Sequence, residues 1–196
     1  MSARLRSLTV VALIAAGGLG LIGSTQTWVV ASLADGDLPV TGSAAVPVLQ
    51  PLMLTALALG LVLTLVGKVL RYVLGALAVA LGIGVAALVT PIAIAPPVSA
   101  VAPAVTERTG ITGSEGIAAL VLGTSSTPWP VITIVVALLI AAAGVAVLLT
   151  AHRWTRGGRR YATDTRATRD AAAPLDAVDS WDDLSRGDDP TDPASR

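Results

Sequence analysis

The chain has 196 residues, of which 54% are hydrophobic and only 13% are charged, and its mean hydropathy is +0.76. This composition excludes an ordinary soluble domain and indicates a membrane protein. Lys and Arg residues number 13 and are balanced by 13 Asp and Glu residues, so the information lies in where the charges are placed. Because there is no Cys, a disulfide framework and a thiolate metal site are both excluded.

Four segments are apolar enough, and long enough at about 20 residues or more, to cross the hydrocarbon core of a bilayer as helices. They are residues 8–30, 44–67, 72–95 and 131–151. The sequence therefore predicts an all-α, polytopic membrane protein whose four transmembrane helices form a bundle within residues 1–154. A short turn around Lys68 and Arg71 joins the second and third spans, which predicts that these two helices are antiparallel neighbours.

The basic residues predict the orientation of the spans. If the spans alternate in direction, one side of the membrane receives Arg4, Arg6, Lys68, Arg71, Arg153, Arg156, Arg159 and Arg160. The other side carries Asp35, Asp37, Glu107 and Glu115 with only Arg108. The positive-inside rule then places both termini in the cytoplasm of a multi-pass protein of the cell (inner) membrane.

The first span has a second interpretation. Basic residues, an apolar run and the stretch Ser32-Leu33-Ala34 imitate a secretory signal peptide with a small-residue cleavage site. The apolar run is long for a signal peptide and continues without charge to Trp28, which favours a retained span. In both interpretations the C-terminal tail stays cytoplasmic.

Two segments are predicted to face away from the termini. Residues 31–43 carry Asp35-Gly36 and Pro39, which are typical of turns. Within residues 96–130, the stretch GSEGIAALVLG is predicted to form a short amphipathic helix on the membrane or bundle surface.

Small residues recur at every fourth position in two spans, where such spacing allows helices to pack closely. The two sets are Ala16, Gly20 and Ser24, and Ala78, Gly82 and Ala86. The stretch GLGLIG at residues 18–23 matches the pattern of a dinucleotide-binding turn. Because it lies inside a predicted span instead of between a strand and a helix, it indicates packing and not nucleotide binding.

Two tryptophans are predicted to lie at the same membrane face, Trp28 where the first span leaves and Trp129 where the fourth begins. Amphipathic indole rings are typical of a membrane interface, so an aromatic belt is the first interpretation. The alternative is a small outer vestibule in which Gln26, Trp28 and Trp129 bind a ligand.

The sequence contains no pattern typical of catalysis. No predicted span contains Asp, Glu, Lys or Arg, there is no Ser-His-Asp set or phosphate loop, and the single His152 has no second ligand near it in the sequence. We therefore predict no enzyme activity, no cofactor and no metal. The basic stretch HRWTRGGRR at residues 152–160 is explained by the positive-inside rule, so nucleic acid is not predicted as a partner.

Residues 155–196 change abruptly to Arg, Asp, Thr, Ala and Pro without hydrophobic periodicity, which predicts a disordered cytoplasmic tail. Near its end stands SWDDLSRGDDPTD, residues 180–192. Ser180 and Asp183 fit a capping box, and Trp181 and Leu184 would share one face of about two helical turns. Two turns are unstable alone, so such a segment would fold only on a surface.

This stretch, the tail motif, is predicted to bind a partner through Trp181 and Leu184. Its acidic residues would face a basic groove on that partner; they are Asp182, Asp183, Asp188 and Asp189. The other interpretation is a solvated acidic tail in which the tryptophan has no role.

Several features together resemble the tryptophan-associated (Trp operon-linked) transmembrane proteins of actinobacteria. These are the four-span layout, TQTWV at the end of the first span, TPWP at the start of the fourth, and the terminal DSWDDLSRGDDPT. The resemblance covers nearly the whole chain. It implies a link to tryptophan biosynthesis and favours a functional tail motif, but it supplies no catalytic or binding residues.

The resulting prediction is a non-catalytic accessory or scaffold protein associated with tryptophan biosynthesis, whose tail docks a cytosolic protein of that pathway. The alternative is a transporter or facilitator subunit for tryptophan or an aromatic precursor. Four thin helices leave little interior for a substrate, so that alternative requires a homo-oligomer. A third interpretation is a purely structural subunit of a larger membrane complex.

Overall fold

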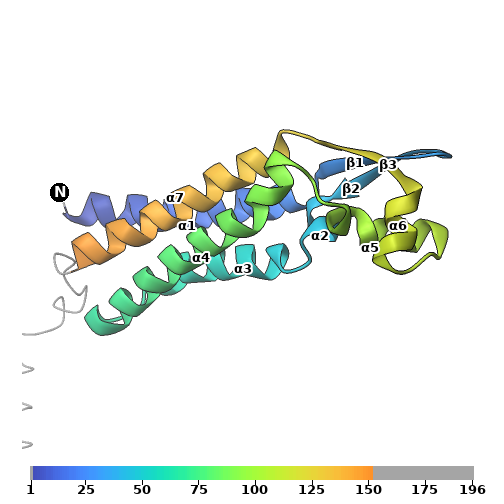
Figure 1. Ribbon diagram of the computed structural model, residues 1–196. Coiled ribbons are helices and arrows are strands. Elements are labelled where there is room, and N and C mark those ends of the chain that lie inside the picture. The colour runs from blue at the N-terminus through green and yellow to red at the C-terminus, as the bar shows by residue number, and fades with distance from the viewer. Residues whose placement is uncertain (1, 152–196) are drawn as a thin grey trace, which may run out of the picture. The chain divides into compact units, whose positions relative to one another are not determined.

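Three long helices and one shorter helix form a bundle in the computed structural model, which describes residues 2–151 (Figure 1). The long helices are α1 (Ser2–Ser24), α4 (Lys68–Ile94) and α7 (Trp129–Thr150). Each contains a stretch long and apolar enough to cross a membrane. The chain is therefore a mostly helical membrane protein, as the sequence predicts.

The predicted second span, residues 44–67, is only partly correct. Its helix, α3 (Leu49–Val62), has 14 residues. At about 1.5 Å per residue it is about 21 Å long, shorter than a hydrocarbon core of about 30 Å. Pro47 lies before α3 and Pro51 in its first turn, where a missing N–H is tolerated, so the helix begins late.

The order of packing in the bundle is α3, α1, α7, α4. Helix α4 packs mainly on α7, α7 also packs on α1, and α1 packs on α3. The predicted side-by-side contact between the second and third spans is therefore minor, although only residues 63–67 join α3 to α4. The predicted turn residues Lys68 and Arg71 belong to the first turn of α4.

Glycines set the close approach of the helices. A Cβ atom added to Gly82 of α4 would lie 2.5 Å from the carbonyl oxygen of Ala137 in α7, and one added to Gly144 of α7 would lie 2.8 Å from the carbonyl oxygen of Gly75. On α1, a Cβ at Gly20 would overlap the Met53 side chain of α3. The prediction that the small-residue faces pack against other helices is confirmed.

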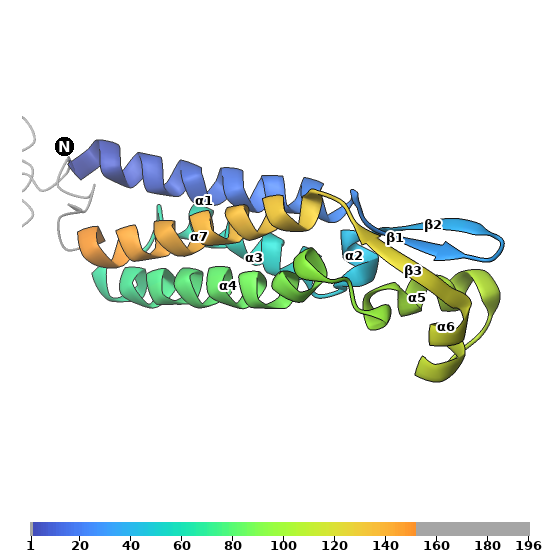
Figure 2. The same ribbon diagram turned by 45° about the horizontal axis from the view of Figure 1, so that its top comes forward.

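A small α/β subdomain stands at one end of the bundle, so the all-α prediction is wrong (Figure 2). Its antiparallel sheet has the order β2-β1-β3 and consists of β1 (Thr27–Leu33), β2 (Gly36–Thr41) and β3 (Val121–Ser126). Its helices are α2 (Gly42–Ala45), α5 (Val98–Thr109) and α6 (Ser114–Leu120).

The predicted first span, residues 8–30, ends six residues early for a local reason. The Ser24 hydroxyl donates to the Leu21 carbonyl and the Thr25 hydroxyl to the Ile22 carbonyl, so side chains bond the last turn of α1. The next residues, Thr27 to Val30, are β-branched or aromatic and suit a strand. The predicted turn at Asp35-Gly36 is confirmed as the hairpin between β1 and β2, with a φ of +122° at Gly36.

The subdomain has an apolar interior of its own. One face of the sheet and the helices α5 and α6 bury side chains against each other, namely Val29, Ala31, Leu33, Val40, Val101, Val105 and Ile117. The predicted short helix is confirmed as α6, but residues 121–123 of that stretch belong to β3. The described part of the chain therefore combines a membrane bundle with a folded extramembrane unit.

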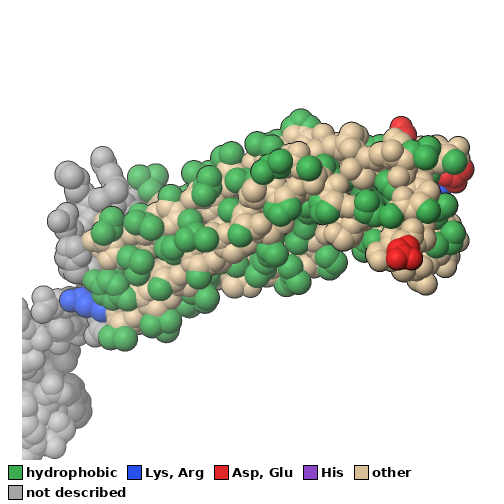
Figure 3. Space-filling view, viewed as in Figure 1, with side chains coloured by type: hydrophobic (Ala, Val, Ile, Leu, Met, Phe, Trp, Pro, Cys, Tyr) green, Lys and Arg blue, Asp and Glu red, His purple; other side chains and the backbone are tan. Residues whose placement is uncertain are grey.

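Charge divides the two ends of the bundle. Figure 3 shows hydrophobic side chains along the helices, acidic side chains on the subdomain and basic side chains at the opposite end. We call these the sheet end, where α1 and α4 finish, and the basic end, where α3 and α7 finish. Arg6, Lys68 and Arg71 lie at the basic end, as predicted for one side of the membrane.

Candidate functional site

Trp28 lies at the junction between the bundle and the subdomain. Its side chain is fully buried, with 0% of its surface exposed. The indole Nε1–H donates to the carbonyl oxygen of Gly23, in the last turn of α1, at 2.9 Å. That carbonyl belongs to the end of a helix, where carbonyl groups lack partners within the helix. Trp28 therefore fastens the first residues of β1 to the end of α1.

Gly42 forms the other wall of the Trp28 site. A Cβ added to Gly42 would lie 2.5 Å from Cε2 and 2.6 Å from Nε1 of the indole, so only a glycine lets α2 approach the ring this closely. The amide N–H of Gly42 also donates to the Gln26 carbonyl at 3.1 Å. Strand β1 and helix α2 are thus held together around one aromatic side chain.

The three residues of the predicted outer vestibule lie near one another but are not equally accessible. Trp129 starts α7, is partly buried, and faces Gly23, where an added Cβ would lie 3.9 Å from its Cε3 atom. Gln26 is partly exposed and its amide donates to the Thr25 hydroxyl at 3.1 Å. Because the Trp28 side chain is fully covered by protein, it is not exposed to lipid headgroups, as the aromatic-belt interpretation requires, so that interpretation is wrong for this residue. Gln26 and Trp129 remain predicted ligand contacts.

The segment that connects β3 to α7 is also hydrogen-bonded to β1. The Thr127 amide donates to the Trp28 carbonyl at 2.9 Å, and the Thr127 hydroxyl donates to the Thr27 carbonyl at 2.7 Å. Two helices of the bundle, α1 and α7, are therefore tied through the same few backbone groups to the sheet. This junction therefore joins α1, α2, β1 and α7 through hydrogen bonds to backbone carbonyls and through one buried ring.

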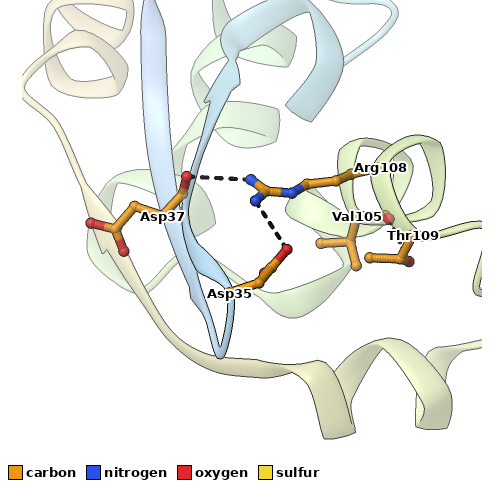
Figure 4. Close-up of polar contacts among 5 residues, drawn as sticks. All are labelled: Asp35, Asp37, Val105, Arg108 and Thr109. Carbon is orange, nitrogen blue, oxygen red and sulfur yellow. Dashed lines mark hydrogen bonds and ion pairs between the residues drawn. The ribbon is translucent and has the colours of Figure 1, made fainter.

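The tip of the hairpin is held by a single ion pair. Figure 4 shows the Arg108 guanidinium of α5 between the two acidic residues of the hairpin. Its Nη2 lies 3.0 Å from Asp35 Oδ2, and its Nη1 donates to the Asp37 carbonyl at 3.5 Å. The Arg108 and Asp35 side chains are 36% and 62% exposed, so water screens their attraction.

Replacing Arg108 with alanine should therefore cost little stability. Exposed ion pairs are worth about 0.2–1 kcal/mol, so we expect a loss of less than about 1 kcal/mol, decreasing further at high salt. Thermal unfolding of the purified protein in detergent, with and without added salt, measures this loss. Thr109→Val, on the same helix, is a matched control that does not touch the ion pair. A large, salt-independent loss would mean that Arg108 has another role.

At the basic end, arginines bond the carbonyls that finish helices and turns. Arg6 donates to the Thr64 carbonyl at 2.7 Å, beyond the end of α3. Arg71, predicted to lie in a loop, is buried and donates to the carbonyls of Val66 at 3.0 Å and Ala151 at 3.5 Å. A cation at the C-terminal end of α7 is favoured by the helix dipole.

The chemistry available to the described part of the chain is limited. Within residues 2–151, no cluster of three or more His, Cys, Asp or Glu side chains could hold a metal ion. The predicted absence of catalysis, metal and cofactor stays a prediction for the whole chain. The tail motif, with Trp181, Leu184 and the four aspartates, lies outside the described residues, as does His152.

A family model for the tryptophan-associated transmembrane protein matches residues 10–191. The chain belongs to this family. The match covers the bundle, the subdomain and nearly all of the tail motif, and it confirms the resemblance noted from the sequence. No curated protein and no solved structure matches this family member.

Sequence reasoning missed the role of Trp28 as the buried centre of the junction. The apolar run of the first span continues into residues 27–33, so a longer helix was the simplest interpretation. A signal was present in the alternation of Val29, Ala31 and Leu33, which is typical of a strand with one buried face. The Ser24-Thr25 pair before it is typical of a helix end.

Proposed function

We propose that this tryptophan-associated transmembrane protein is a non-catalytic accessory protein of tryptophan biosynthesis that docks a cytosolic protein of that pathway at the membrane. The observation that carries the proposal is the extent of the family match, which runs to residue 191 and so includes Trp181 and Leu184. A tail without a role would have little reason to belong to the pattern of a membrane family. The tail motif thus becomes the docking segment, and the bundle its anchor.

The charge distribution supports the orientation that docking requires. The basic end carries Arg6, Lys68 and Arg71, whereas the sheet end carries four acidic residues and Arg108. By the positive-inside rule the basic end lies in the cytoplasm of the cell membrane. Helix α7 finishes at that end, so the tail would begin on the side where biosynthetic enzymes are found.

The interior of the bundle favours an anchor over a carrier. Backbone atoms of α4 and α7 approach each other through Gly75, Gly82 and Gly144, and the buried side chains of the bundle are mostly apolar. Transport sites in membranes commonly use ionisable groups or broken helices near the midplane. A tryptophan-transport subunit therefore remains the alternative, and it would need several copies to build a path.

The proposal is tested by affinity purification of the full chain from gently solubilised native membranes. We expect the natural chain to retain a cytosolic tryptophan-pathway enzyme. The Trp181→Ala, Leu184→Ala double variant should retain at least about ten times less of it. Truncating one buried tryptophan contact commonly costs about 2 kcal/mol or more, and about 1.4 kcal/mol corresponds to a factor of ten.

The chain offers a matched control for this experiment. Tyr161 and Leu175 also lie in the tail but outside the tail motif, so the Tyr161→Ala, Leu175→Ala variant removes an aromatic and a leucine without touching it. Equal retention by both double variants, or no retained pathway enzyme with any chain, would refute docking by the tail motif.

A further inference from the structure

The two edges of the sheet differ. Because the order is β2-β1-β3, β2 and β3 each have a strand neighbour on one side only. An edge strand presents a row of backbone N–H and C=O groups that can pair with another chain, and proteins commonly block such edges with proline, charge or covering segments.

The β2 edge is blocked. The Thr127 amide bonds the Trp28 carbonyl, which sets the alternation along β1: residues 28, 30 and 32 face β3, and the residues between them face β2. Ser32 and Val30 face away from β2, so the residues opposite them in β2, Asp37 and Pro39, direct their own backbone groups to the outer edge of β2. The Asp37 carbonyl accepts from Arg108, and Pro39 has no N–H to donate.

The β3 edge has none of these obstacles. Gly123 and Ser125 face β1 by the same alternation, so Thr124 and Ser126 direct their backbone groups outward. Residues 121–126 contain no proline and no charge, and four of the six are exposed. At the start of the strand, the Val121 amide donates to the Ile117 carbonyl of α6. Among the described residues, no backbone hydrogen bond outside the sheet takes up the N–H or C=O groups of Thr124 and Ser126. Leu122 is 73% exposed beside this edge.

A second copy of the chain fits this edge poorly. Strands β1 and β2 continue roughly in the direction of the helices (Figures 1 and 2). Two copies in one membrane share their orientation, so their β3 strands would run parallel. In a symmetric dimer, a two-fold axis parallel to these strands relates the two copies. Each N–H of one β3 edge then faces the same N–H of the other, and each carbonyl faces the same carbonyl, so no hydrogen bonds form between them.

The charge of the subdomain restricts the occupant further. The sheet end carries Asp35, Asp37, Glu107 and Glu115 against the single Arg108, and Figure 3 shows the acidic side chains gathered there. The start of β3 lies toward this acidic region, because Val121 pairs with Leu33 next to the hairpin tip. A complementary segment is basic at the end that lies there.

We propose that the outer edge of β3 binds an extended segment of a partner protein by strand addition, antiparallel to β3, with uncharged residues opposite Thr124 and Ser126 and basic residues at its C-terminal end. Backbone hydrogen bonds supply the pairing and charge supplies the register. This interaction lies at the sheet end and does not depend on the tail, so it stands or falls separately from the docking function.

The probe is a fluorescent peptide, Thr-Val-Thr-Val-Thr-Lys-Lys, and its control ends in two glutamates. Anisotropy with the full chain in detergent should show saturable, salt-sensitive binding of the lysine peptide only. Thr124→Pro removes one outward N–H and should weaken binding by about tenfold, the equivalent of about 1.4 kcal/mol. Thr124→Val keeps that N–H but loses the hydroxyl bond to the Pro96 carbonyl, which is 3.0 Å long, and should bind like the natural chain.

A second variant guards against misfolding of Thr124→Pro. Leu122→Lys changes an exposed side chain and adds a positive charge at the edge, so it should also weaken binding of the lysine peptide by several-fold while the sheet keeps its hydrogen-exchange protection. No saturable binding, or equal binding by Thr124→Pro and Thr124→Val, would overturn the proposal. A dimer of the natural chain that Thr124→Pro abolishes would overturn it as well, because a second copy would then occupy the edge.

Discussion

Replacing Trp28 with alanine should detach the sheet from the bundle while leaving the membrane helices folded. The substitution empties a fully buried site and removes the bond from Nε1 to the Gly23 carbonyl. Buried aromatic to alanine changes typically cost about 3–5 kcal/mol, and the Gly23 carbonyl keeps its bond from the Gln26 amide at 3.2 Å, so most of the cost comes from the emptied site. Hydrogen exchange of the protein in detergent should show lost protection in β1 and β3, with α4 and α7 unchanged.

Trp28→Phe is the matched variant for this prediction. It keeps an aromatic ring against Gly42 but cannot donate to Gly23, so protection should fall between that of the natural chain and that of Trp28→Ala. If Trp28→Ala exchanges like the natural chain, the junction is held by Thr127 and the hairpin alone. If all helices lose protection together, the bundle and the subdomain unfold as one unit, and the prediction that the sheet detaches alone is wrong.

The junction also bears on the signal-peptide interpretation of the first span. Ser32 and Leu33, part of the predicted cleavage stretch, lie in the central strand of the sheet with partners on both sides. A peptidase needs its substrate extended and unpaired, so this arrangement favours a retained α1. Helix α1 also packs against both α3 and α7, and its retention stays a prediction.

The membrane helices could be predicted because long apolar runs without charge have few other solutions. Helices α1, α4 and α7 carry this signal through most of their lengths, with charged residues only near the starts of α1 and α4. The predicted ends of these helices were less accurate because hydropathy carries no information on hydrogen bonding. Ser24 and Thr25 end α1 through their hydroxyl groups, and Arg71 is drawn into α4 because it bonds the carbonyls of neighbouring segments.

The subdomain could not be predicted as a sheet because its strands are short and come from distant segments. Strand β3 reads VLGTSS, which has no clear alternation, and its pairing with β1 spans about half of the chain. Helix α5 contains Pro103 and follows Pro96 and Pro97, a pattern more typical of a loop. Strand β3 and helix α5 both depend on tertiary packing with β1 residues such as Val29 and Leu33, and such packing leaves little signal in the local sequence.

The residues of the predicted outer vestibule lie near one another but differ in accessibility, and their binding of a ligand stays a prediction. Trp28 and Trp129 both lie beside Gly23, as expected for residues at the same end of two neighbouring helices. Their difference in burial follows from the unpredicted fold of residues 27–45, in which Trp28 belongs to β1 and Gly42 of α2 packs against its ring. A residue at the end of a span can be interfacial or buried, and only the fold of the connecting segment decides between the two.

Replacing Gly82 with alanine should separate α4 from α7. The added Cβ would lie 2.5 Å from the Ala137 carbonyl oxygen and 2.6 Å from the Ala141 amide nitrogen. These are backbone atoms, which cannot move aside as a flexible side chain can, so the helices must shift. Overpacking typically costs about 1–3 kcal/mol, and the lost contacts along both helices should place the effect at the upper end. Unfolding by sodium dodecyl sulfate, followed by circular dichroism, measures the change.

Gly84→Ala is the control that isolates packing from helix propensity. It lies two residues away in α4, but a Cβ there would meet no atom within 4 Å. Both substitutions gain the same propensity, since alanine favours a helix over glycine by up to about 1 kcal/mol in water. The Gly84 variant should therefore be as stable as the natural chain or slightly more stable. Equal loss in both would mean that glycine is required for some reason other than the approach of α7, whereas loss at Gly82 alone establishes that the backbone contact holds the bundle closed.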